Sequence, residues 1–600
     1  MKISIKFKAT ILPVLILFAL GSFALSPVAQ AKPPPAGEDR GDGNSAGEHV
    51  SALNPGTTGS NNTAHGWFSL FSDTSGSSNT ADGFQALYSN TTGSNNSANG
   101  YQALFSNTIG NNNTANGGFA LSSNGTGSFN TATGDDALLS NTTGNNNAAI
   151  GFFALGSNTT GSANTATGNF ALASNTTADG NTASGASALV SNTIGIGNTA
   201  TGYRALESNI DGIRNTANGV FALNHNISGG GNTAIGYQAL VNNTADGNTA
   251  IGNDSLVSNT IGFNNTATGN DALVSNTIGF DNTANGTGAL QNNTIGSANT
   301  ANGFHALFSS TTSGDNTANG FEALFSNTDG VGNTAIGVAA LYSNTTGFNN
   351  TATGGSALQN NTGAANTAMG GGALFNNTTG TGNTALGTQA GMGVSTANYV
   401  ICIGTDGQNV DHSCYIGNIF GKTSFEGVGV FVNSDGKLGT SLSSRRFKKD
   451  IRAMDKASEA ILAFKPVTFH YKTDTKGTAQ FGLIAEEVAE VNPDLIVRDK
   501  DGKPYTVRYE QINAMLLNEF LKEHRKVQEQ EASISGLKST AAKQDAIIAQ
   551  QQKRMEVLTA QLKEQAAQIQ KVSAQIEMDE FATGRIRRGG PAPRVVLNNP

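Results

Sequence analysis

The chain has almost no positive charge over most of its length, and this absence excludes two classes of partner. Between residues 50 and 395 the only Lys or Arg residues are Arg204 and Arg214. Binding to nucleic acid or to an anionic membrane surface depends on clustered Lys and Arg side chains. We therefore expect no nucleic-acid partner. Charged residues make up only 13% of the chain, which is unlike the roughly four ordinary domains that its length would suggest.

Cysteine is also scarce. Cys402 and Cys414 are the only two cysteines, and His412 is the only histidine near them. These three side chains do not make up the four ligands of a structural zinc site, so we expect no metal and no other cofactor. In an exported protein the two cysteines either form a disulfide or stay as free thiols, and their spacing leaves both states open.

Catalytic patterns are missing from the same long region. Calcium-binding Gly-x-Gly-x-Asp repeats do not occur. Acidic residues such as Asp135, Asp136 and Asp254 occur sporadically and form no recognisable pair for glycan hydrolysis. We expect no enzymatic site and no small-molecule substrate in this part of the chain.

The one long apolar run lies at the N-terminus. Three lysines within the first eight residues precede an apolar stretch from about Ala9 to Leu25, and Ala29-Gln30-Ala31 follows it. This order is typical of a secretory signal peptide. We predict a signal peptide over residues 1–31, a flexible linker over 32–54, and export to the cell surface or the extracellular space. An uncleaved membrane anchor is the alternative.

What the chain does contain is one short unit repeated many times. The glycine of Asn-Thr-Ala-x-Gly recurs in twenty copies from Gly66 to Gly387, spaced by 17 residues and twice by 16. Nineteen copies carry Leu four residues after that glycine, and turn-forming Ser, Asn, Thr and Gly follow. A fixed short period of this composition predicts a β-solenoid over residues 55–395, with one copy per rung.

The alternation of side chains along a strand predicts the two faces of each rung. Ala, Gly and Leu, at offsets of minus two, zero and plus four from the repeat glycine, are expected to point inward, and Thr and the variable residue outward. Stacking of rungs places Asn over Asn, which predicts ladders of side-chain amides. At ~4.8 Å per rung, twenty rungs would give a rod of roughly 95 Å.

The repeats resemble the head repeats of trimeric autotransporter adhesins. Those heads are left-handed β-rolls that associate in threes, although the period here is two or three residues longer. The resemblance implies a homotrimeric roll that acts as a spacer or as an adhesin-like display surface. A cell-surface glycan or another host surface is its candidate target.

The sequence changes character after the repeats. We predict a β-rich neck over 396–442 with a hairpin turn at Asn433–Lys437. Beyond it we predict helices over 455–464 and 481–491, a strand over 467–472, and a hairpin around Asp501-Gly502. One long helix is expected to begin near Glu510.

That long helix has the heptad pattern of a coiled coil. Every seventh position from Phe520 to Ile576 is apolar, and the d positions mix Leu537, Leu558 and Val572 with glutamines. We predict a parallel coiled coil over 520–577, followed by a disordered basic tail over 578–600. Ile-rich a positions with Gln at d fit two or three strands, and the trimeric roll favours three.

A serine and a lysine lie close together where the neck ends. Ser443 precedes Lys448 by five residues, and Arg445, Arg446 and Lys449 crowd the lysine. A hydroxyl attacks an amide only if a base removes its proton, and burial or neighbouring cations favour the neutral lysine that can do so. The spacing is also compatible with loop serines beside a solvated basic face.

Three blocks here resemble the intramolecular chaperone of endosialidase-type phage tailspikes, the peptidase S74 family. They are Ser443-x4-Lys448, Phe-Gly-Leu-Ile-Ala-Glu-Glu-Val at 481–488, and Tyr509-x2-Ile-x-Ala-x-Leu-Leu. The resemblance spans about 443–530 and implies a chaperone domain over 443–519 that trimerises, guides assembly of the β-rich stalk and cleaves itself. Ser443 would be the nucleophile and new N-terminus, Lys448 the base, and Leu442–Ser443 the bond that is cut.

One residue departs from the family pattern. The position after the nucleophile is often Asp in that family and is Ser444 here, so either serine remains a candidate nucleophile. The whole chain is thus expected to be mainly β: a β-solenoid of about twenty repeats, a small α+β chaperone domain and a coiled-coil helix. The alternatives are a prophage-type tailspike that acts on polysaccharide, and a structural fibre with an uncleaved stalk.

Overall fold

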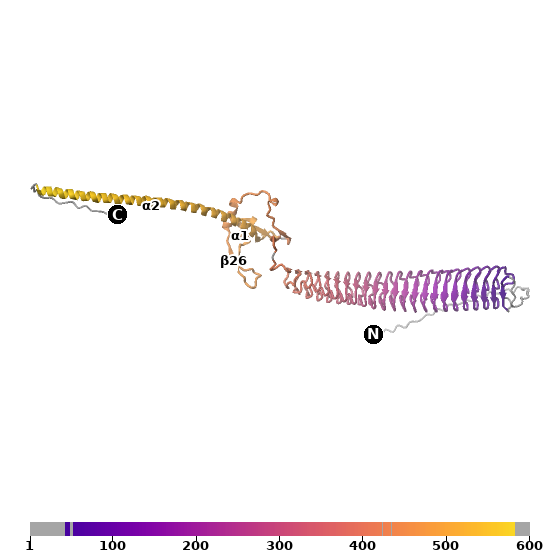
Figure 1. The fold of residues 1–600 in the computed structure, drawn as a ribbon. Helices are drawn as coiled ribbons and strands as arrows, with labels where there is room; N and C mark the ends of the chain where they lie inside the picture. The colour runs from indigo at the N-terminus through magenta and orange to yellow at the C-terminus, as the bar shows by residue number, and fades with distance from the viewer. Residues whose placement is uncertain (1–41, 48–51, 423, 434, 583–600) are drawn as a thin grey trace, which may run out of the picture. The chain divides into compact units, whose positions relative to one another are not determined.

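The computed structural model describes residues 42–47, 52–422, 424–433 and 435–582. The predicted signal peptide and the last residues of the basic tail lie outside this range. The chain divides into two compact units, one ending at Lys422 and the other beginning at Thr423 (Figure 1).

The first unit is a parallel β-solenoid, as the repeats predict. Its described residues form a 23-stranded sheet in which each strand pairs in parallel with the next along the chain. The ladder extends past the twenty repeats at both ends and spans roughly 105 Å at ~4.8 Å per rung. Its strands are β1 (Ser45–Ala46), β2 (Thr63–His65), β3 (Thr80–Asp82), β4 (Ser97–Asn99), β5 (Thr114–Asn116), β6 (Thr131–Thr133), β7 (Ala148–Ile150), β8 (Thr165–Thr167), β9 (Thr182–Ser184), β10 (Thr199–Thr201), β11 (Thr216–Asn218), β12 (Thr233–Ile235), β13 (Thr249–Ile251), β14 (Thr266–Thr268), β15 (Thr283–Asn285), β16 (Thr300–Asn302), β17 (Thr317–Asn319), β18 (Thr334–Ile336), β19 (Thr351–Thr353), β20 (Thr367–Met369), β21 (Thr384–Leu386), β22 (Ile401–Ile403) and β23 (Cys414–Ile416).

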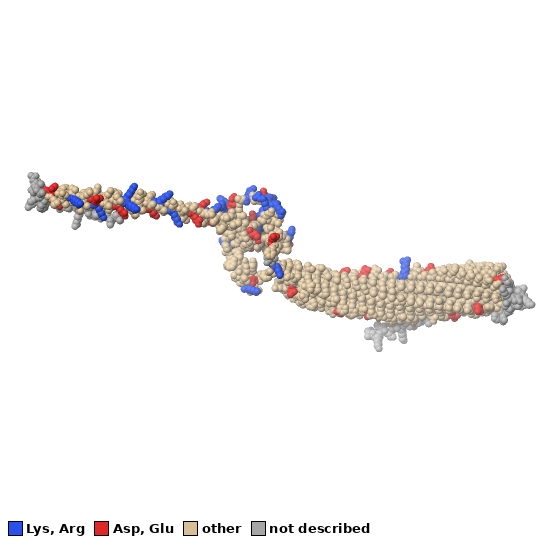
Figure 2. All heavy atoms as spheres, viewed as in Figure 1, with Lys and Arg blue, Asp and Glu red and all other residues tan. Residues whose placement is uncertain are grey.

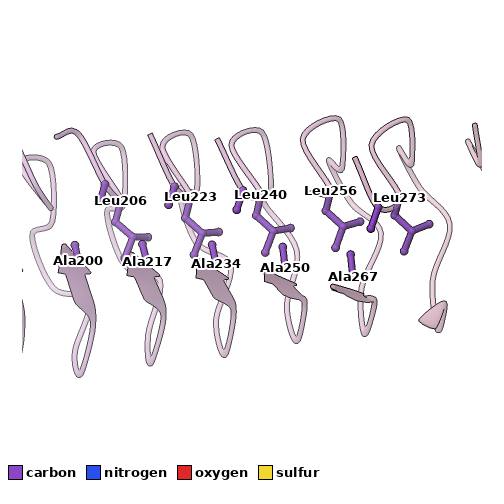
Figure 3. Packing of buried hydrophobic residues seen from close by; sticks show 14 of the residues in the cluster. Ala200, Leu206, Ala217, Leu223, Ala234, Leu240, Ala250, Leu256, Ala267 and Leu273 are labelled. Carbon is purple, nitrogen blue, oxygen red and sulfur yellow. The ribbon is translucent and has the colours of Figure 1, made fainter. Parts of the chain in front are cut away.

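Alanine and leucine form the narrow apolar core of the solenoid. In β12 the central Ala234 is fully buried, while Thr233 and Ile235 face outward. Ala234 pairs with Ala217 on one side, and the same register continues from rung to rung. Figure 3 shows these alanines opposite a stacked column of leucines such as Leu240. The predicted inward alanine and outward threonine are confirmed.

The repeat leucine points into the core from a turn with left-handed backbone conformations, and not from a strand whose side chains alternate. Leu240 lies in a turn after β12 and has φ 53°, and Gln238 before it has φ 55°. Each left-handed non-glycine residue costs on the order of 1 kcal/mol or more. Complete burial of a leucine side chain stabilises the folded state by about 2 kcal/mol. The packing of Leu240 therefore offsets the cost of the turn and keeps it in this conformation.

Glycine is required at the end of most repeat strands because the next rung approaches it closely. Gly236 has φ 137°, a conformation that L-residues rarely adopt. A Cβ atom at this position would also clash with the backbone oxygen of Gly252 in the following rung.

Two buried ladders of asparagine run along the solenoid. In one ladder the backbone N–H of Asn113 donates to Oδ1 of Asn96 at 3.0 Å, and its Nδ2 donates to the oxygen of Gly127 at 2.9 Å. In the other, Nδ2 of Asn141 donates to Oδ1 of Asn124 at 2.7 Å. The predicted amide ladders are present, but they lie inside the rung. These bonds satisfy turn carbonyls that would otherwise be buried without partners.

The two cysteines lie on the last two strands of the ladder and are free thiols. Cys402 pairs with Tyr415, and Cys414 pairs with Ile401. This register places one cysteine in the core and the other on the surface, because neighbouring residues on a strand face opposite ways. Burial raises the pKa of the Cys402 thiol, which makes it less reactive.

The second unit is a small α+β domain that continues into a long helix. It contains the antiparallel hairpins β24 (Val430–Val432) with β25 (Leu438–Thr440), β26 (Val467–Phe469) with β27 (Gln480–Gly482), and β28 (Ile496–Arg498) with β29 (Pro504–Val507). Its helices are the 3-10 helices η1 (Arg445–Phe447), η2 (Asp455–Ala463) and η3 (Pro493–Leu495), and the α-helices α1 (Ala485–Val491) and α2 (Tyr509–Ala582).

Two of the predicted helices take a different form in this domain. The segment predicted as a helix over 455–464 is the 3-10 helix η2. The helix predicted to begin at Phe481 begins instead at Ala485, because Phe481 lies on β27 and pairs with Thr468 of β26. Tertiary strand pairing here outweighs local helix propensity.

The second unit has a small core and carries most of the charge. Val488, Leu495, Ile496, Val507 and Met515 are its buried apolar residues. Figure 2 shows Lys, Arg, Asp and Glu side chains along the second unit, whereas the solenoid surface has few. Among the described residues, no helix is both long and apolar enough to cross a membrane.

Candidate functional site

A single 3-10 turn brings Ser443 and Lys448 together. The backbone N–H groups of Phe447 and Lys448 donate to the oxygens of Ser444 and Arg445, at 3.0 and 3.1 Å. This turn folds the five-residue interval back on itself. The Lys448 Nζ atom lies 3.4 Å from Ser443 Oγ and donates a hydrogen bond to it. The distance is long for a hydrogen bond.

The electrostatic surroundings of the pair are basic and open to solvent. Ser443, Ser444 and Lys448 are all exposed in the single chain. The guanidinium of Arg446 lies over the ring of Phe447, 4.6 Å from its centroid. Water screens the neighbouring cations from Lys448 while its side chain stays exposed.

The strand before the pair is as exposed as the pair itself. Every residue of β24 and β25 is exposed. Val430, Val432 and Leu438 are exposed despite being apolar, with about 60% of each residue accessible to solvent. β25 ends at Thr440, two residues before Leu442. A two-stranded hairpin with both faces in water is marginal by itself, so the segment that leads to Leu442–Ser443 lacks packing within one chain.

A second serine–lysine contact lies at the start of the long helix. Ser458 in η2 is fully buried, donates to a carboxylate oxygen of Glu519, and accepts from Nδ2 of Asn518 at 2.7 Å. Lys522 Nζ lies 3.4 Å from Ser458 Oγ and forms a 2.7 Å ion pair with Glu519. Sequence reasoning missed this cluster because its members lie about sixty residues apart and have no local signature.

The chemistry of this second cluster differs from that of the first. The hydrogen bond with Glu519 raises the pKa of Lys522, and the bonds from Lys522 and Ser458 lower the pKa of Glu519. Lys522 is therefore held in its charged form and cannot act as a base. The cluster attaches η2 to α2.

The helix α2 presents an unpartnered apolar stripe. The positions predicted as the a positions of the heptads include Phe520, Val527, Ile534, Ile548 and Ile569, and all of these side chains are exposed. The structure shows one continuous helix, and its pairing with other copies stays a prediction.

The described residues hold no group of three or more His, Cys, Asp or Glu side chains that could bind a metal ion. In the solenoid, burial followed by the charge of Asp135 raises the pKa of Asp136. These two adjacent carboxyl groups lie on one short turn. Glycan hydrolysis needs two carboxyl groups on either side of the scissile bond, and these two adjacent groups on one turn do not have that arrangement.

Comparison with known proteins gives one match, and it coincides with the candidate site. No curated protein and no solved structure matches the chain. A family model does match, and the matched segment of the chain begins at Ser443. Residues 443–497, the C-terminal segment that contains Ser443 and Lys448, match the peptidase S74 family, described as the chaperone of endosialidase.

Proposed function

We propose that this protein is an exported homotrimeric fibre whose C-terminal domain aligns three chains and then cleaves itself between Leu442 and Ser443. The match of residues 443–497 to the endosialidase chaperone family carries the proposal. An S74 chaperone domain behind a β-solenoid fits a trimeric protein of the tail-fibre or tailspike type, since such domains are associated with trimerisation. The contact between Lys448 and Ser443 supplies the chemistry.

Self-cleavage would proceed through an ester. Neutral Lys448 takes the proton from Ser443 Oγ as this oxygen attacks the carbonyl carbon of Leu442. The C–N bond then breaks, the proton passes to the Ser443 nitrogen, and an ester joins Leu442 to the serine side chain. Water hydrolyses the ester, leaving a carboxylate on Leu442 and a free α-amino group on Ser443.

Assembly would supply the burial that one chain lacks. A lysine base must lose its proton near neutral pH, which requires desolvation, and Lys448 is exposed in the single chain. The exposed apolar residues of β24, β25 and α2 are the surfaces that two further copies would cover. Cleavage is thereby made conditional on trimer formation.

The repetitive solenoid explains why such a domain is useful. Successive rungs have nearly the same sequence, so three solenoids could associate out of step at little cost. A domain that fixes the three chains at one end removes these misaligned states. Once the domain is cut away, the template is no longer connected to the fibre. The assembled fibre would then be kinetically hard to unfold.

The intact mass of the purified protein tests the proposed base. Wild type is expected to give two fragments that meet at Leu442–Ser443, whereas Lys448→Ala stays whole. Lys449→Ala is the matched control, because it removes a neighbouring cation and leaves the serine contact, and we expect it to be cleaved. A wild-type protein that stays whole as a folded trimer would contradict self-cleavage and leave a structural fibre with a permanent stalk.

A further inference from the structure

One rung near the middle of the solenoid is a residue short. Gly236 and Gly252 are 16 residues apart, and the missing residue falls in the turn Asn243-Thr244-Ala245-Asp246-Gly247-Asn248. The full-length turn over 175–181 reads Asn-Thr-Thr-Ala-Asp-Gly-Asn and differs only by one additional threonine. The chain therefore contains its own undeleted version of this turn.

The deletion changes the turn but not the core. Leu240 and Leu256 remain fully buried and stacked in the column of leucines (Figure 3). In the full-length turn, Nδ2 of Asn175 donates to Oδ1 of the preceding rung's Asn158 at 2.8 Å. In that turn Nδ2 of Asn175 also donates to the oxygen of Ala178 at 3.1 Å. In the short turn Nδ2 of Asn243 keeps the equivalent bond, to the oxygen of Ala245, but does not donate to Asn226 of the preceding rung.

The shortened turn leaves a defect in the ladder. Asn226 Oδ1 is buried and has no hydrogen-bond partner, because Asn243 of the next rung no longer reaches it. A buried acceptor without a partner is unfavourable. The short turn therefore costs stability where the full-length turn would not.

The short turn also lines a hollow in the side of the solenoid. It is a shallow depression, open to solvent, with a volume of about 530 Å³. Thr244, Ala245 and Asp246 of the short turn line it together with residues from the turns of the two neighbouring rungs. Side chains that line it are Ser228, Thr244, Asp246, Ile261, Phe263 and Asn264.

One wall is apolar and the rest is rich in hydrogen-bond acceptors. Ile261 and Phe263 are exposed, and the ring of Phe263 is held in place by stacking on Phe280, with 5.0 Å between centroids. One oxygen of the Asp246 carboxylate accepts the backbone N–H of Gly230 at 2.7 Å, which fixes the carboxylate and leaves further lone pairs free.

From this arrangement we propose that the hollow at the short rung binds a neutral saccharide. A pyranose ring has an apolar face, which would pack on Phe263, and hydroxyl groups, which would donate to Asp246. The lining contains no Lys or Arg, and the Asp246 carboxylate repels anions, so acidic sugars are disfavoured. A single carboxylate is also too few ligands for a divalent cation.

The test applies the purified protein to an array of immobilised oligosaccharides. Neutral oligosaccharides of hexose and N-acetylhexosamine units share the array with sialylated and uronic-acid oligosaccharides. We expect wild type to bind neutral members, and Phe263→Ala to bind them about tenfold more weakly or worse. Phe348→Ala is the matched control, since Phe348 occupies the same turn position in a distant rung, and its binding should equal that of wild type.

Insertion of one threonine after Thr244 provides the sharpest variant. It recreates the turn found at 175–181, gives Asn226 a ladder partner and fills the hollow, so Tm should stay equal or rise while saccharide binding is lost. Binding that persists in this folded variant would overturn the proposal. So would a wild-type protein that binds no neutral member or prefers the acidic ones. The proposal is independent of self-cleavage, because an uncleaved Ser443→Ala protein keeps the same hollow.

Discussion

At the scale of single residues, buried asparagine determines the cross-section of the solenoid as much as alanine and leucine do. Asn113 and Asn141 are fully buried and bond both to the neighbouring rung and to turn carbonyls of the chain. An apolar residue at these positions would leave the carbonyls of the turns without donors. The repeat therefore requires Asn at two positions for structural reasons, before any role of its surface.

The first rungs contain one natural exception to the ladder. Asp73 stands where the next rungs have Asn90 and Asn107, and it is fully buried. It accepts hydrogen bonds from Thr57 Oγ1 at 2.7 Å, from Asn90 Nδ2 at 2.8 Å and from the backbone of Gly76 at 3.2 Å. Despite these bonds, burial raises the pKa of the carboxyl group.

Asp73→Asn should stabilise the first rungs at neutral pH by about 1 kcal/mol. A raised pKa in the folded state means that Asp73 favours folding below its usual value of 3.8 and that this contribution is lost as the pH rises through the folded pKa. Asparagine removes this dependence. Hydrogen exchange of residues 57–93, measured at pH about 4 and about 7, should show slower exchange in the variant, mainly at the higher pH. If the variant and wild type exchange at equal rates at both pH values, the buried charge of Asp73 carries no penalty.

At the scale of elements, the sequence predicts the rungs well and the small domain less well. The periodicity of Thr-Ala-x-Gly fixes each short strand, because its alternation and the glycine that ends it are local features. The conformation of Leu240 was not predictable from alternation, since the turn is held in a left-handed conformation by packing. Phe481 was assigned to a helix because its strand partner Thr468 lies outside the local window.

The candidate site shows the same contrast. Ser443 and Lys448 are close in sequence, so their spacing predicted a contact that one 3-10 turn makes. The cluster of Ser458, Glu519 and Lys522 depends on a helix packing against a distant segment, and no local pattern marks it.

Removal of the Ser458 hydroxyl should loosen the attachment of η2 to α2. Ser458→Ala loses the bond with Asn518, at a cost of about 1 kcal/mol for the buried hydroxyl, and thermal unfolding of the C-terminal domain should occur at a lower temperature. The lowered pKa of Glu519 also predicts that the cluster stabilises the domain at neutral pH and loses this effect as the pH falls below 4.5. Ser533→Ala, on the exposed part of α2, is the control. An unchanged Tm in Ser458→Ala would show that the cluster does not hold the domain together.

At the scale of the whole molecule, the chain has two parts with opposite needs. The solenoid is stable by repetition but has little to define its register against other copies. The C-terminal unit has a small core and exposed apolar surfaces on β24, β25 and α2. Association of three C-terminal units would satisfy both needs, because it buries these surfaces and fixes the starting point of the three solenoids.

Charges in the apolar stripe of α2 should prevent both association and cleavage. Ile534→Asp with Ile548→Asp places carboxylates at two a positions, whereas Ser539→Asp with Ala546→Asp adds the same charge at f positions. Sedimentation equilibrium should find the first variant monomeric and whole, and the second trimeric and cleaved. If the a-position variant still forms trimers and is cleaved, the helix does not drive assembly.

We propose that Ser443 cuts the chain at its own amide bond. The intact mass of the purified wild-type protein beside Ser443→Ala and Ser444→Ala tests this step. We expect wild type and Ser444→Ala to be split between Leu442 and Ser443, and Ser443→Ala to remain a single uncut chain. Cleavage of Ser443→Ala at the same bond, or a wild-type protein that is folded, trimeric and whole, would contradict it.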